Sequence, residues 1–500
     1  MGIVIRQSLK TVAVTYLGIA LGFVNSLWLY PYVLSEEQIG LSRVLINAAF
    51  LLATFASLGS ANIPNRFFPY FKDRQNKHNG FLFFLLLLGF FGYLLFLALF
   101  LSLKPLIFSI YRDSAPLLVD YYYYLIPFTA IVLFWSILEA YTIIQQMPVV
   151  PSFVREVLVR GLIGTALITL LLRWIDFHGF VNLVVLSYGV LLLVIVLYLR
   201  SQQLLFLEPN RSVFKSGHVK GMLVYGGFVL LGNASGAVIA NIDGLMLSAY
   251  SGLRSTGIYT IAFFIANIVE IPRRSLSQVL IPLVTEANKN DDFAMINTLY
   301  KKSSINQLIV GGLLFIGLWC NIENVFLLIP HGEVYLQGKW VVFWIGLSKL
   351  FDMTTGINAE IIGTSKYYKY DLLFYVLLCI LGVITNMIFI PIYNLTGAAF
   401  ASAISIFLFN TMRFCLIAVK YKMQPFSLST LTVILLGAGI IASSAIVPSL
   451  WHPLVDIAVR STVIAVVFIG VVLFTRVSVD INTVAQKSME RARKIFQGKA

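Results

Sequence analysis

The stretch VAVTYLGIALGFVNSLWLYPYVL at residues 12–34 decides how the rest of the chain is interpreted. It contains no charged residue and exceeds the ~20 residues that an α-helix needs to cross the hydrocarbon core of a bilayer. It is also longer than the core of a secretory signal peptide, and it lacks the small-residue pattern of a cleavage site. The stretch therefore predicts a first membrane-spanning helix.

The composition extends this interpretation to the whole chain. Hydrophobic residues make up 59% of the 500 residues and charged residues 12%, and the mean hydropathy is +0.88. A soluble protein could not bury so much apolar surface, because its core grows more slowly than its chain. Soluble enzymes, disordered scaffolds and secreted disulfide domains are therefore excluded. The cysteines, Cys320, Cys379 and Cys415, each lie in an apolar run and are expected to act as small hydrophobic residues.

Fourteen apolar runs of near-spanning length follow one another. They lie at 12–34, 38–60, 81–103, 120–145, 153–174, 180–199, 221–247, 256–281, 304–329, 341–363, 371–392, 397–419, 427–449 and 454–475. With the N-terminus inside, and with residues toward the span ends counted with the adjoining loops, this layout places 28 Lys and Arg residues on the cytoplasmic side and five on the external side. Short cytoplasmic loops collect positive charge, and a missing or extra span in mid-chain would destroy the asymmetry. We therefore predict an all-α integral membrane protein with about 14 transmembrane helices and both termini in the cytoplasm.

A faint internal repeat predicts two lobes. Gly40 and Gly257 both begin a helix after a short turn and lie 217 residues apart, an offset equal to six spans. Two such halves would share one orientation and bind substrate between them. The predicted parts are an N-lobe at 1–200, a cytoplasmic linker at 201–220, a C-lobe at 221–420, two further spans within 421–476, and a basic cytoplasmic tail at 477–500. The tail is expected to form an amphipathic helix on the membrane surface.

Polar residues inside the spans indicate where a hydrated path would lie. An ionisable residue at mid-membrane costs at least ~2.5 kcal/mol and needs a partner or a wet cavity. In span 2, Arg43 and Asn47 share a helical face, although Arg43 lies near enough to the outer interface to extend into water instead. In span 7, Tyr225 and Asp243 are five turns apart on one face. Glycines on that face equally fit close helix packing.

The segment IYTIAFFIANIVEIPRRSLSQVLIP at 258–282 carries the densest polar cluster. Asn267, Glu270 and Arg274 lie on one flank, and Pro272 is expected to bend the helix. Glu270 and Arg274, at i and i+4, could simply neutralise each other. Arg273 would then be left without a local anion.

Span 10 carries a second polar stripe, and sequence alone allows it to be either a buried pair or a cavity wall. Its members are Lys349, Asp352, Gly356 and Glu360. In spans 1, 2, 7 and 8, the presumed lining, three arginines oppose two carboxylates. A mildly cationic pocket suits an anionic headgroup, because guanidinium binds phosphate through two parallel hydrogen bonds, and suits a cationic drug poorly.

The candidate site follows from these patterns. The substrate-binding candidates are Asn25, Arg43, Asn47, Arg66, Tyr225, Asn267, Arg273 and Arg274, and the ion-coupling candidates are Asp243, Glu270 and Asp352. No catalytic residue, metal site or cofactor is predicted, because the five histidines are scattered in loops and no GxxxxGK phosphate loop is present. A membrane glycosyl or acyl transferase is an alternative without a supporting motif. The positive charge lies in short tracts between apolar runs, which disfavours nucleic acid as a partner.

Two stretches resemble a known family. IDGLMLSAYSGLRSTGIYTIAFFIANIVEIPRRSLSQVLIP at 242–282 and PIYNLTGAAFASAIS at 391–405, with the fourteen-span layout, resemble the Wzx-type polysaccharide flippases. These belong to the multidrug/oligosaccharidyl-lipid/polysaccharide exporter superfamily, together with lipid II flippases and MATE antiporters. The resemblance implies two six-helix lobes in a V plus two C-terminal helices, and alternating access. It also implies export of an undecaprenyl-pyrophosphate glycan from the inner to the outer leaflet of a bacterial inner membrane, for a surface polysaccharide such as the O-antigen of lipopolysaccharide.

The same resemblance bears on residues and partners. Family members place cationic side chains in a central cavity, and Arg43, Arg66, Arg273 and Arg274 are the matching candidates. Membrane lipids and a polysaccharide polymerase with its chain-length machinery are the implied partners. Span 1 lacks the acidic residue that couples ions in many MATE transporters, which disfavours the cation/drug antiporter alternative. Coupling to a proton gradient, a sodium gradient or the membrane potential stays open.

Overall fold

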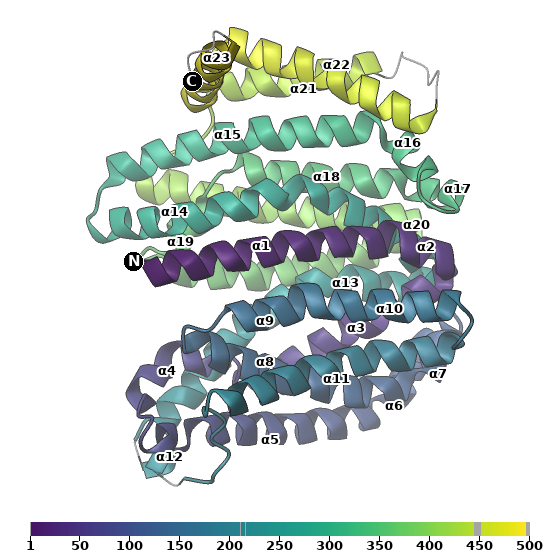
Figure 1. Ribbon diagram of the computed structural model, residues 1–500, viewed down its shortest axis with the longest axis vertical. Helices are drawn as coiled ribbons and strands as arrows, with labels where there is room; N and C mark the ends of the chain where they lie inside the picture. The colour runs from purple at the N-terminus through teal and green to yellow at the C-terminus, as the bar shows by residue number, and fades with distance from the viewer. Residues whose placement is uncertain (1, 211, 216, 445–451, 497–500) are drawn as a thin grey trace. The chain divides into compact units, whose positions relative to one another are not determined.

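The computed structural model describes residues 2–210, 212–215, 217–444 and 452–496, and the regular elements in these ranges are all helices (Figure 1). Contacts within the chain divide it into two units, Met1–Thr260 and Ile261–Ala500. The predicted linker at 201–220 lies inside the first unit, so the contact units do not coincide with the lobes predicted from the repeat. The division into lobes stays a prediction.

The first unit is built from long helices joined by short helical turns. Its elements are α1 (Gly2–Val24), the π-helical η1 (Asn25–Leu29), α2 (Tyr30–Val33), α3 (Glu36–Ala56), α4 (Ile63–Phe71), η2 (Lys77–Gly80), α5 (Phe81–Ser102), α6 (Lys104–Tyr111), α7 (Pro116–Asp120), η3 (Tyr122–Tyr124), α8 (Leu125–Ile144), α9 (Val149–Phe153), η4 (Val154–Leu158), α10 (Val159–Leu171), α11 (Phe177–Ser201), α12 (Ser212–Lys215) and most of α13 (Val219–Ala266). Helix α8 packs against α3, α5 and α11, and α11 packs against α10.

The second unit follows the same construction. It contains η5 (Asn267–Glu270), α14 (Ile271–Lys289), α15 (Phe293–Cys320), α16 (Ile322–Leu327), α17 (Gly332–Tyr335), η6 (Leu336–Gly338), α18 (Lys339–Thr354), α19 (Asn358–Gly363), α20 (Tyr368–Tyr421), α21 (Leu428–Ser444), α22 (Pro453–Phe474) and α23 (Val479–Phe496). Helix α18 packs against α15 and α20, and α15 also packs against α21 and α22. The predicted tail at 477–500 contains the helix α23, and residues 497–500 lie outside the described part of the chain. The place of this helix on the membrane surface stays a prediction.

All fourteen predicted spans fall on helical segments. Nine described helical stretches are long and apolar enough to cross a membrane, and two of them, Val219–Arg274 and Tyr368–Tyr421, are long enough to cross twice. The predicted spans at 153–174, 341–363 and 427–449 fall on shorter helices, and residues 445–449 of the last one lie outside the described part of the chain. The prediction of an all-α membrane protein with about 14 helices is confirmed.

Both double-length helices are broken where a residue enters the left-handed region. Gly252 has φ 81°, and Asn394 has φ 54°. Glycine adopts this conformation without a steric cost, and asparagine tolerates it better than most residues. Each break separates two of the predicted spans, so the chain reverses through a single residue rather than through a loop.

Span 10 is interrupted, contrary to the prediction of one continuous helix. Helix α18 ends at Thr354 and α19 begins at Asn358, with Gly356 between them at φ 65°. The left-handed turn at Gly356 means that Glu360 does not continue the helical stripe of Lys349 and Asp352.

A reciprocal contact joins α3 to α13 inside the first unit. A Cβ atom added at Gly40 would overlap the carbonyl oxygen of Leu253, and one added at Gly257 would overlap the carbonyl oxygen of Glu36. Gly40 and Gly257 are counterparts in the predicted repeat, and Glu36 and Leu253 are counterparts at the same offset. Such a self-complementary contact is typical of two copies related by a twofold axis. It supports the internal repeat.

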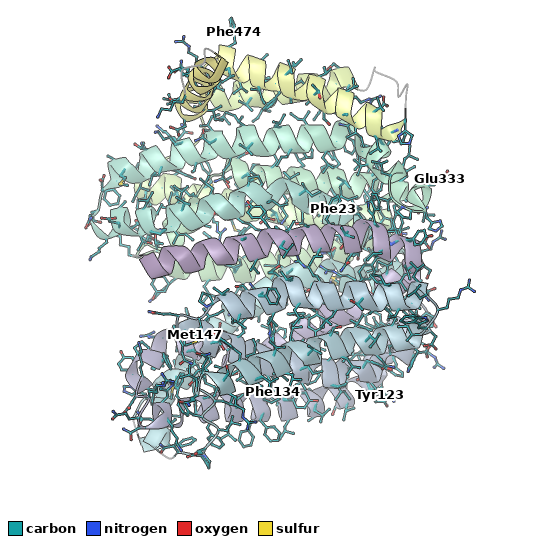
Figure 2. The ribbon with its side chains drawn as sticks, viewed as in Figure 1. Phe23, Tyr123, Phe134, Met147, Glu333 and Phe474 are labelled. Carbon is teal, nitrogen blue, oxygen red and sulfur yellow. The ribbon has the colours of Figure 1, made fainter. Side chains whose placement is uncertain are left out.

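The exterior of the helices is apolar. Phe474 is 89% exposed and points away from the ribbon, and Phe23 is 42% exposed (Figure 2). Large exposed apolar surfaces are unfavourable in water but favourable against lipid chains. The exposed side chains therefore agree with a chain that lies in a bilayer.

Candidate functional site

Arg43 lies in a shell of tyrosines in the first unit. Helix α3 places it near Tyr30 of α2, Tyr188 of α11 and Tyr259 of α13, which interact with it electrostatically. Among the described residues no carboxylate lies within ion-pair distance of Arg43. Tyr259 donates its hydroxyl hydrogen to Asp243 Oδ2 at 2.8 Å, and Asp243 is 8% exposed. The structure therefore brings two predicted site residues, Arg43 and Asp243, to one tyrosine, Tyr259.

The two amide candidates of the first spans are buried. Asn25 is 7% exposed and donates from Nδ2 to the carbonyl oxygen of Arg160 at 2.7 Å. Asn47 is 6% exposed and faces Gly244, where an added Cβ would lie 3.3 Å from its Nδ2. Both amides serve helix packing in this structure.

Arg66 and Tyr225, both predicted site residues, contact each other. The guanidinium carbon of Arg66 in α4 lies 5.2 Å from the ring centroid of Tyr225 in α13 and 5.8 Å from that of Phe67. Arg66 is exposed, and none of the ion pairs between described residues involves it. Its positive charge is therefore available to an anionic ligand.

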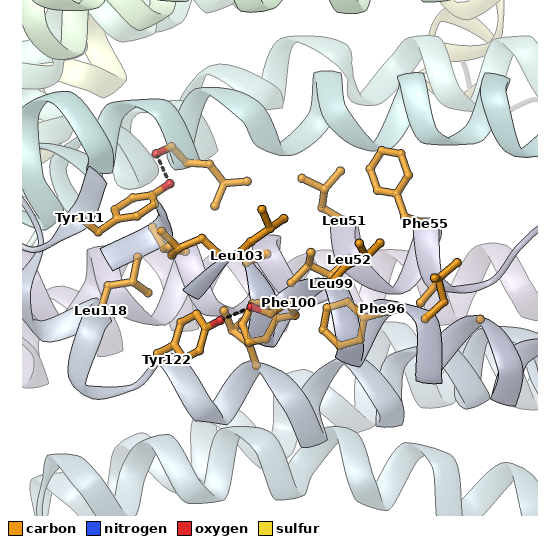
Figure 3. Close-up of a pocket in the computed structure, with 18 of the residues that line it drawn as sticks. Leu51, Leu52, Phe55, Phe96, Leu99, Phe100, Leu103, Tyr111, Leu118 and Tyr122 are labelled. Atoms are coloured by element: carbon orange, nitrogen blue, oxygen red, sulfur yellow. Dashed lines mark hydrogen bonds between the residues drawn. The ribbon is translucent and has the colours of Figure 1, made fainter. Parts of the chain in front are cut away.

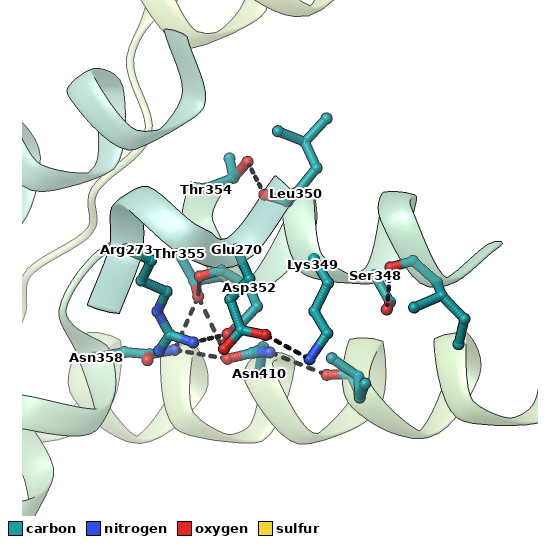
Figure 4. Close-up of polar contacts among 12 residues, drawn as sticks. Glu270, Arg273, Ser348, Lys349, Leu350, Asp352, Thr354, Thr355, Asn358 and Asn410 are labelled. Carbon is teal, nitrogen blue, oxygen red and sulfur yellow. Dashed lines mark hydrogen bonds and ion pairs between the residues drawn. The ribbon is translucent and has the colours of Figure 1, made fainter. Parts of the chain in front are cut away.

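The cluster of the second unit is made of ion pairs between spans (Figure 4). Glu270 Oε2 and Lys349 Nζ are 2.6 Å apart, and Arg273 pairs with Asp352. The four side chains are 13–19% exposed. The anion that Arg273 lacks locally comes from α18 and not from its own helix. The polar stripe of span 10 is one half of this pairing.

The local sequence explains how these side chains meet. The α-helix ends at Ala266, η5 continues as a tighter 3₁₀ turn through Glu270, and Pro272 opens α14. A proline is tolerated in the first turn of a helix, where its missing N–H is not needed. The helix type changes just before Pro272, Glu270 and Arg273 both pair with side chains of α18, and the bend at Pro272 stays a prediction.

Arg274 differs from its neighbour. It is exposed, and no ion pair between described residues includes it. Glu270 forms its close ion pair with Lys349, and its interaction with Arg274 acts at longer range. Asn267 donates from Nδ2 to the carbonyl oxygen of Phe263 at 2.7 Å within its own helix. Arg274 is thus the accessible cation of this segment, and Arg273 the buried one.

Residues 4–288 match the polysaccharide biosynthesis protein family. The chain belongs to this family. No curated protein matches it.

Solved structures with similar folds include a lipid II flippase, MurJ, in an inward closed conformation, with a TM-score of 0.73, 14% identity, and coverage of 94% of this chain and 99% of that one. An inward-facing MATE family multidrug resistance transporter of the MOP superfamily has a TM-score of 0.60 and 15% identity over 82% and 94% of the two chains. An outward-facing MATE family transporter has a TM-score of 0.51 and 14% identity, with coverage of 84% of this chain and 95% of that one. This member of the polysaccharide biosynthesis protein family therefore has the fold of these transporters.

The first unit of this family member also contains an apolar cavity of about 550 Å³ (Figure 3). Its lining includes Leu51, Phe55, Phe96 and Leu99. Two hydroxyls border it, and one of them, on Tyr111, already donates to the carbonyl oxygen of Leu245 at 3.1 Å. A cavity lined almost wholly by carbon can hold a lipid chain but offers no partner to a phosphate or sugar.

Sequence reasoning missed several members of the charged cluster. Arg413, which lies toward the cytoplasmic end of the predicted span at 397–419 and is counted with that side, is 2% exposed and pairs with Asp371 at 2.6 Å. Asn358 and Asn410 are fully buried and hydrogen-bonded to each other at 3.2 Å. The available signal was the rarity of ionisable residues inside apolar runs, which applies to Arg413 as it does to Arg273.

Proposed function

We propose that this protein is a flippase that moves a lipid-linked oligosaccharide, an undecaprenyl-pyrophosphate glycan, from the inner to the outer leaflet for surface polysaccharide biosynthesis. The observation that carries the proposal is the pair of exposed arginines, Arg66 and Arg274, that have no ion-pair partner among the described residues. A pyrophosphate leaving water needs cationic partners, and guanidinium supplies paired hydrogen bonds to it. A cationic drug would be repelled by the same groups.

The mechanism is physical rather than chemical. The barrier to crossing is burial of a charged, hydrated head in a medium that offers it no partners. Alternating access would bind the head from one side of the membrane and release it on the other, while the lipid chain stays in the bilayer. The protein would act as a transporter and form no covalent bond.

Coupling would act through the acidic candidates. Glu270 and Asp352 are each held by a cation, so protonation of either would release Lys349 or Arg273. Asp243 is tied to Tyr259. A proton gradient, a sodium gradient or the membrane potential could supply the energy at these positions.

The proposed setting is a bacterial inner membrane with both termini in the cytoplasm, where a polysaccharide polymerase and chain-length machinery would use the exported product. A cysteine introduced at Ser114 should then react with an impermeant thiol reagent in intact cells, and one at Asn76 should be protected. The cysteine-free chain is the background for both variants.

Deletion of the protein tests the function. Cells without it should accumulate the glycolipid on the inner leaflet, lose surface glycan, and keep normal sensitivity to cationic dyes. Dye hypersensitivity with normal surface glycan would instead favour the antiporter alternative.

A further inference from the structure

Three pairs of side chains link α4 to α13 in the first unit. Asn233 donates from Nδ2 to Asn62 Oδ1 at 2.7 Å. The Arg66 guanidinium lies 5.2 Å from the Tyr225 ring centroid. The rings of Tyr70 and His218 lie 4.9 Å apart at an angle of 35°. We call these six residues the α4–α13 ladder.

The ladder forms a face because of its spacing. Asn62, Arg66 and Tyr70 recur every four residues, which places them on one side of α4. Their partners on and just before α13 lie seven and eight residues apart, or about two turns. The ladder residues of α4 become more exposed toward Tyr70, which is 64% exposed.

A different, apolar face of α4 packs against the neighbouring helices. Ile63, Phe67 and Phe71 are at most 8% exposed. An added Cβ at Gly226 would touch Ile63 at 3.3 Å, and Phe71 stacks on Phe81 with ring centroids 5.0 Å apart. This apolar face anchors α4 by burial, so the exposed ladder is not needed as the anchor.

The chemistry of the ladder suits a sugar. The hydrogen bond between Asn62 and Asn233 leaves the Nδ2 of Asn62 and the Oδ1 of Asn233 without a hydrogen-bond partner among the described residues, and neither side chain is buried. Hydroxyls both donate and accept, so they match this pair of groups. The exposed ring of Tyr70 supplies flat apolar surface with a polar edge, and Arg66 supplies a positive charge. An acyl chain would use only the rings, and an inorganic anion only the arginine.

We propose that the α4–α13 ladder binds the sugar rings of the lipid-linked glycan at the cytoplasmic face, next to the pyrophosphate. The inference rests on the proposed function and deepens it, because it assigns glycan recognition to a defined surface. The cytoplasmic assignment follows from the positive charge of the segment around Arg66. The exposed Tyr70 ring offers a face to the sugars, and the partly buried Tyr225 ring lies beneath the Arg66 guanidinium.

The test compares two lipids on the full-length protein in detergent. One is synthetic undecaprenyl pyrophosphate, and the other is the pyrophosphoryl-lipid glycan fraction extracted from cells that lack the protein. Tyr70→Leu and Tyr225→Leu remove the ring at similar volume, and Tyr70→Phe and Tyr225→Phe are the matched controls. Tyr70→Leu should weaken glycolipid binding at least ~5-fold and change binding of the bare pyrophosphate less than ~2-fold, because only the ring contact is lost. Tyr225→Leu should also weaken glycolipid binding, and it removes the ring beneath Arg66 as well. The phenylalanine variants should bind both lipids like the wild type.

The outcomes separate the two claims. If Tyr70→Leu binds the glycolipid like the wild type, or loses both lipids equally, the ladder is overturned and the proposed function is left standing. A wild-type protein that binds neither lipid would overturn the proposed function itself. Tyr70→Leu keeps the test valid if Tyr225→Leu fails to fold, because Tyr70 is largely exposed.

Discussion

Arg273 and Arg274 are consecutive in the chain but differ in environment. Arg273 is a buried partner of Asp352, whereas Arg274 is exposed. Removing one member of a buried ion pair leaves the other charge without compensation, at a cost of about 3–5 kcal/mol. We therefore expect Arg273→Ala to lower the thermal stability of the purified protein, measured by size-exclusion chromatography after heating. Arg274→Ala should keep normal stability and reduce surface glycan.

The control replaces both partners. Arg273→Leu with Asp352→Leu removes the two charges together, and apolar replacement of a buried pair is often neutral for stability. The double variant should recover most of the stability lost in Arg273→Ala. Equal destabilisation by Arg273→Ala and Arg274→Ala would contradict the distinct roles given to the two arginines.

The residue scale also marks the limit of sequence reasoning. The apolar surroundings of Arg273 predicted that it needs a partner, and it has one. The identity of Asp352 could not be predicted, because it depends on which spans are neighbours. In the same way, Arg66 and Tyr225 were separate candidates, and only the packing of α4 on α13 places one over the other.

At the scale of elements, the glycine contact between α3 and α13 makes a reciprocal prediction. Gly40→Ala and Gly257→Ala each place a methyl group against a backbone carbonyl of the other helix. Backbone cannot move aside as a flexible side chain can, and overpacking costs about 1–3 kcal/mol. Both variants should lower the melting temperature by similar amounts. Gly236→Ala is the control in α13, since nothing lies within 4 Å of its added Cβ. If Gly236→Ala lowers the melting temperature as much as Gly40→Ala does, the contact is refuted.

Helix α23 is tied to α15 by Asp480. Its carboxylate accepts from Asn306 Nδ2 at 3.0 Å and from Lys302 Nζ at 3.2 Å. These hydrogen bonds, that of Asn306 foremost, hold the pKa of Asp480 below its ordinary value. The folded chain therefore binds this proton less readily than the unfolded chain, so the stabilisation is fully present above the ordinary pKa of ~3.9 and is lost as pH falls through the folded value.

Limited proteolysis of the C-terminal segment checks this attachment. Asp480 stays ionised between pH 7 and pH 5, so the attachment of α23 should not change over this range. A protease that is active at both pH values should therefore cleave the wild type at the same rate at each. The Asp480→Asn variant should be cleaved faster than the wild type at both pH values. The effect should be modest, because an exposed ion pair such as Asp480 with Lys302 contributes only ~0–1 kcal/mol. Glu490→Gln is the matched control, since none of the ion pairs between described residues includes Glu490. Unchanged cleavage of Asp480→Asn would show that α23 is held by apolar packing alone.

At the scale of the molecule, the spans were predictable because each is a local signal. An apolar run of ~20 residues reports a membrane helix without knowledge of its neighbours. The breaks were less predictable: those at Gly252 and Asn394 coincide with expected turns, but the turn at Gly356 lies inside a run that reads as one span. The apolar cavity and the ion pairs depend on packing between distant segments, and no local pattern encodes them.

The most direct test of the proposed function is transfer of the glycolipid in reconstituted vesicles. The pyrophosphoryl-lipid glycan fraction from cells lacking the protein is placed in the outer leaflet, and an impermeant glycosidase measures how much glycan remains accessible. Glycan that has moved to the inner leaflet is protected from the enzyme outside, so vesicles with the wild-type protein should protect a growing fraction of it. Vesicles with the double variant Arg66→Ala and Arg274→Ala, and empty vesicles, should protect the glycan more slowly. Equal accessibility with and without the wild-type protein, under an imposed proton or sodium gradient as well as without one, would contradict the flippase account.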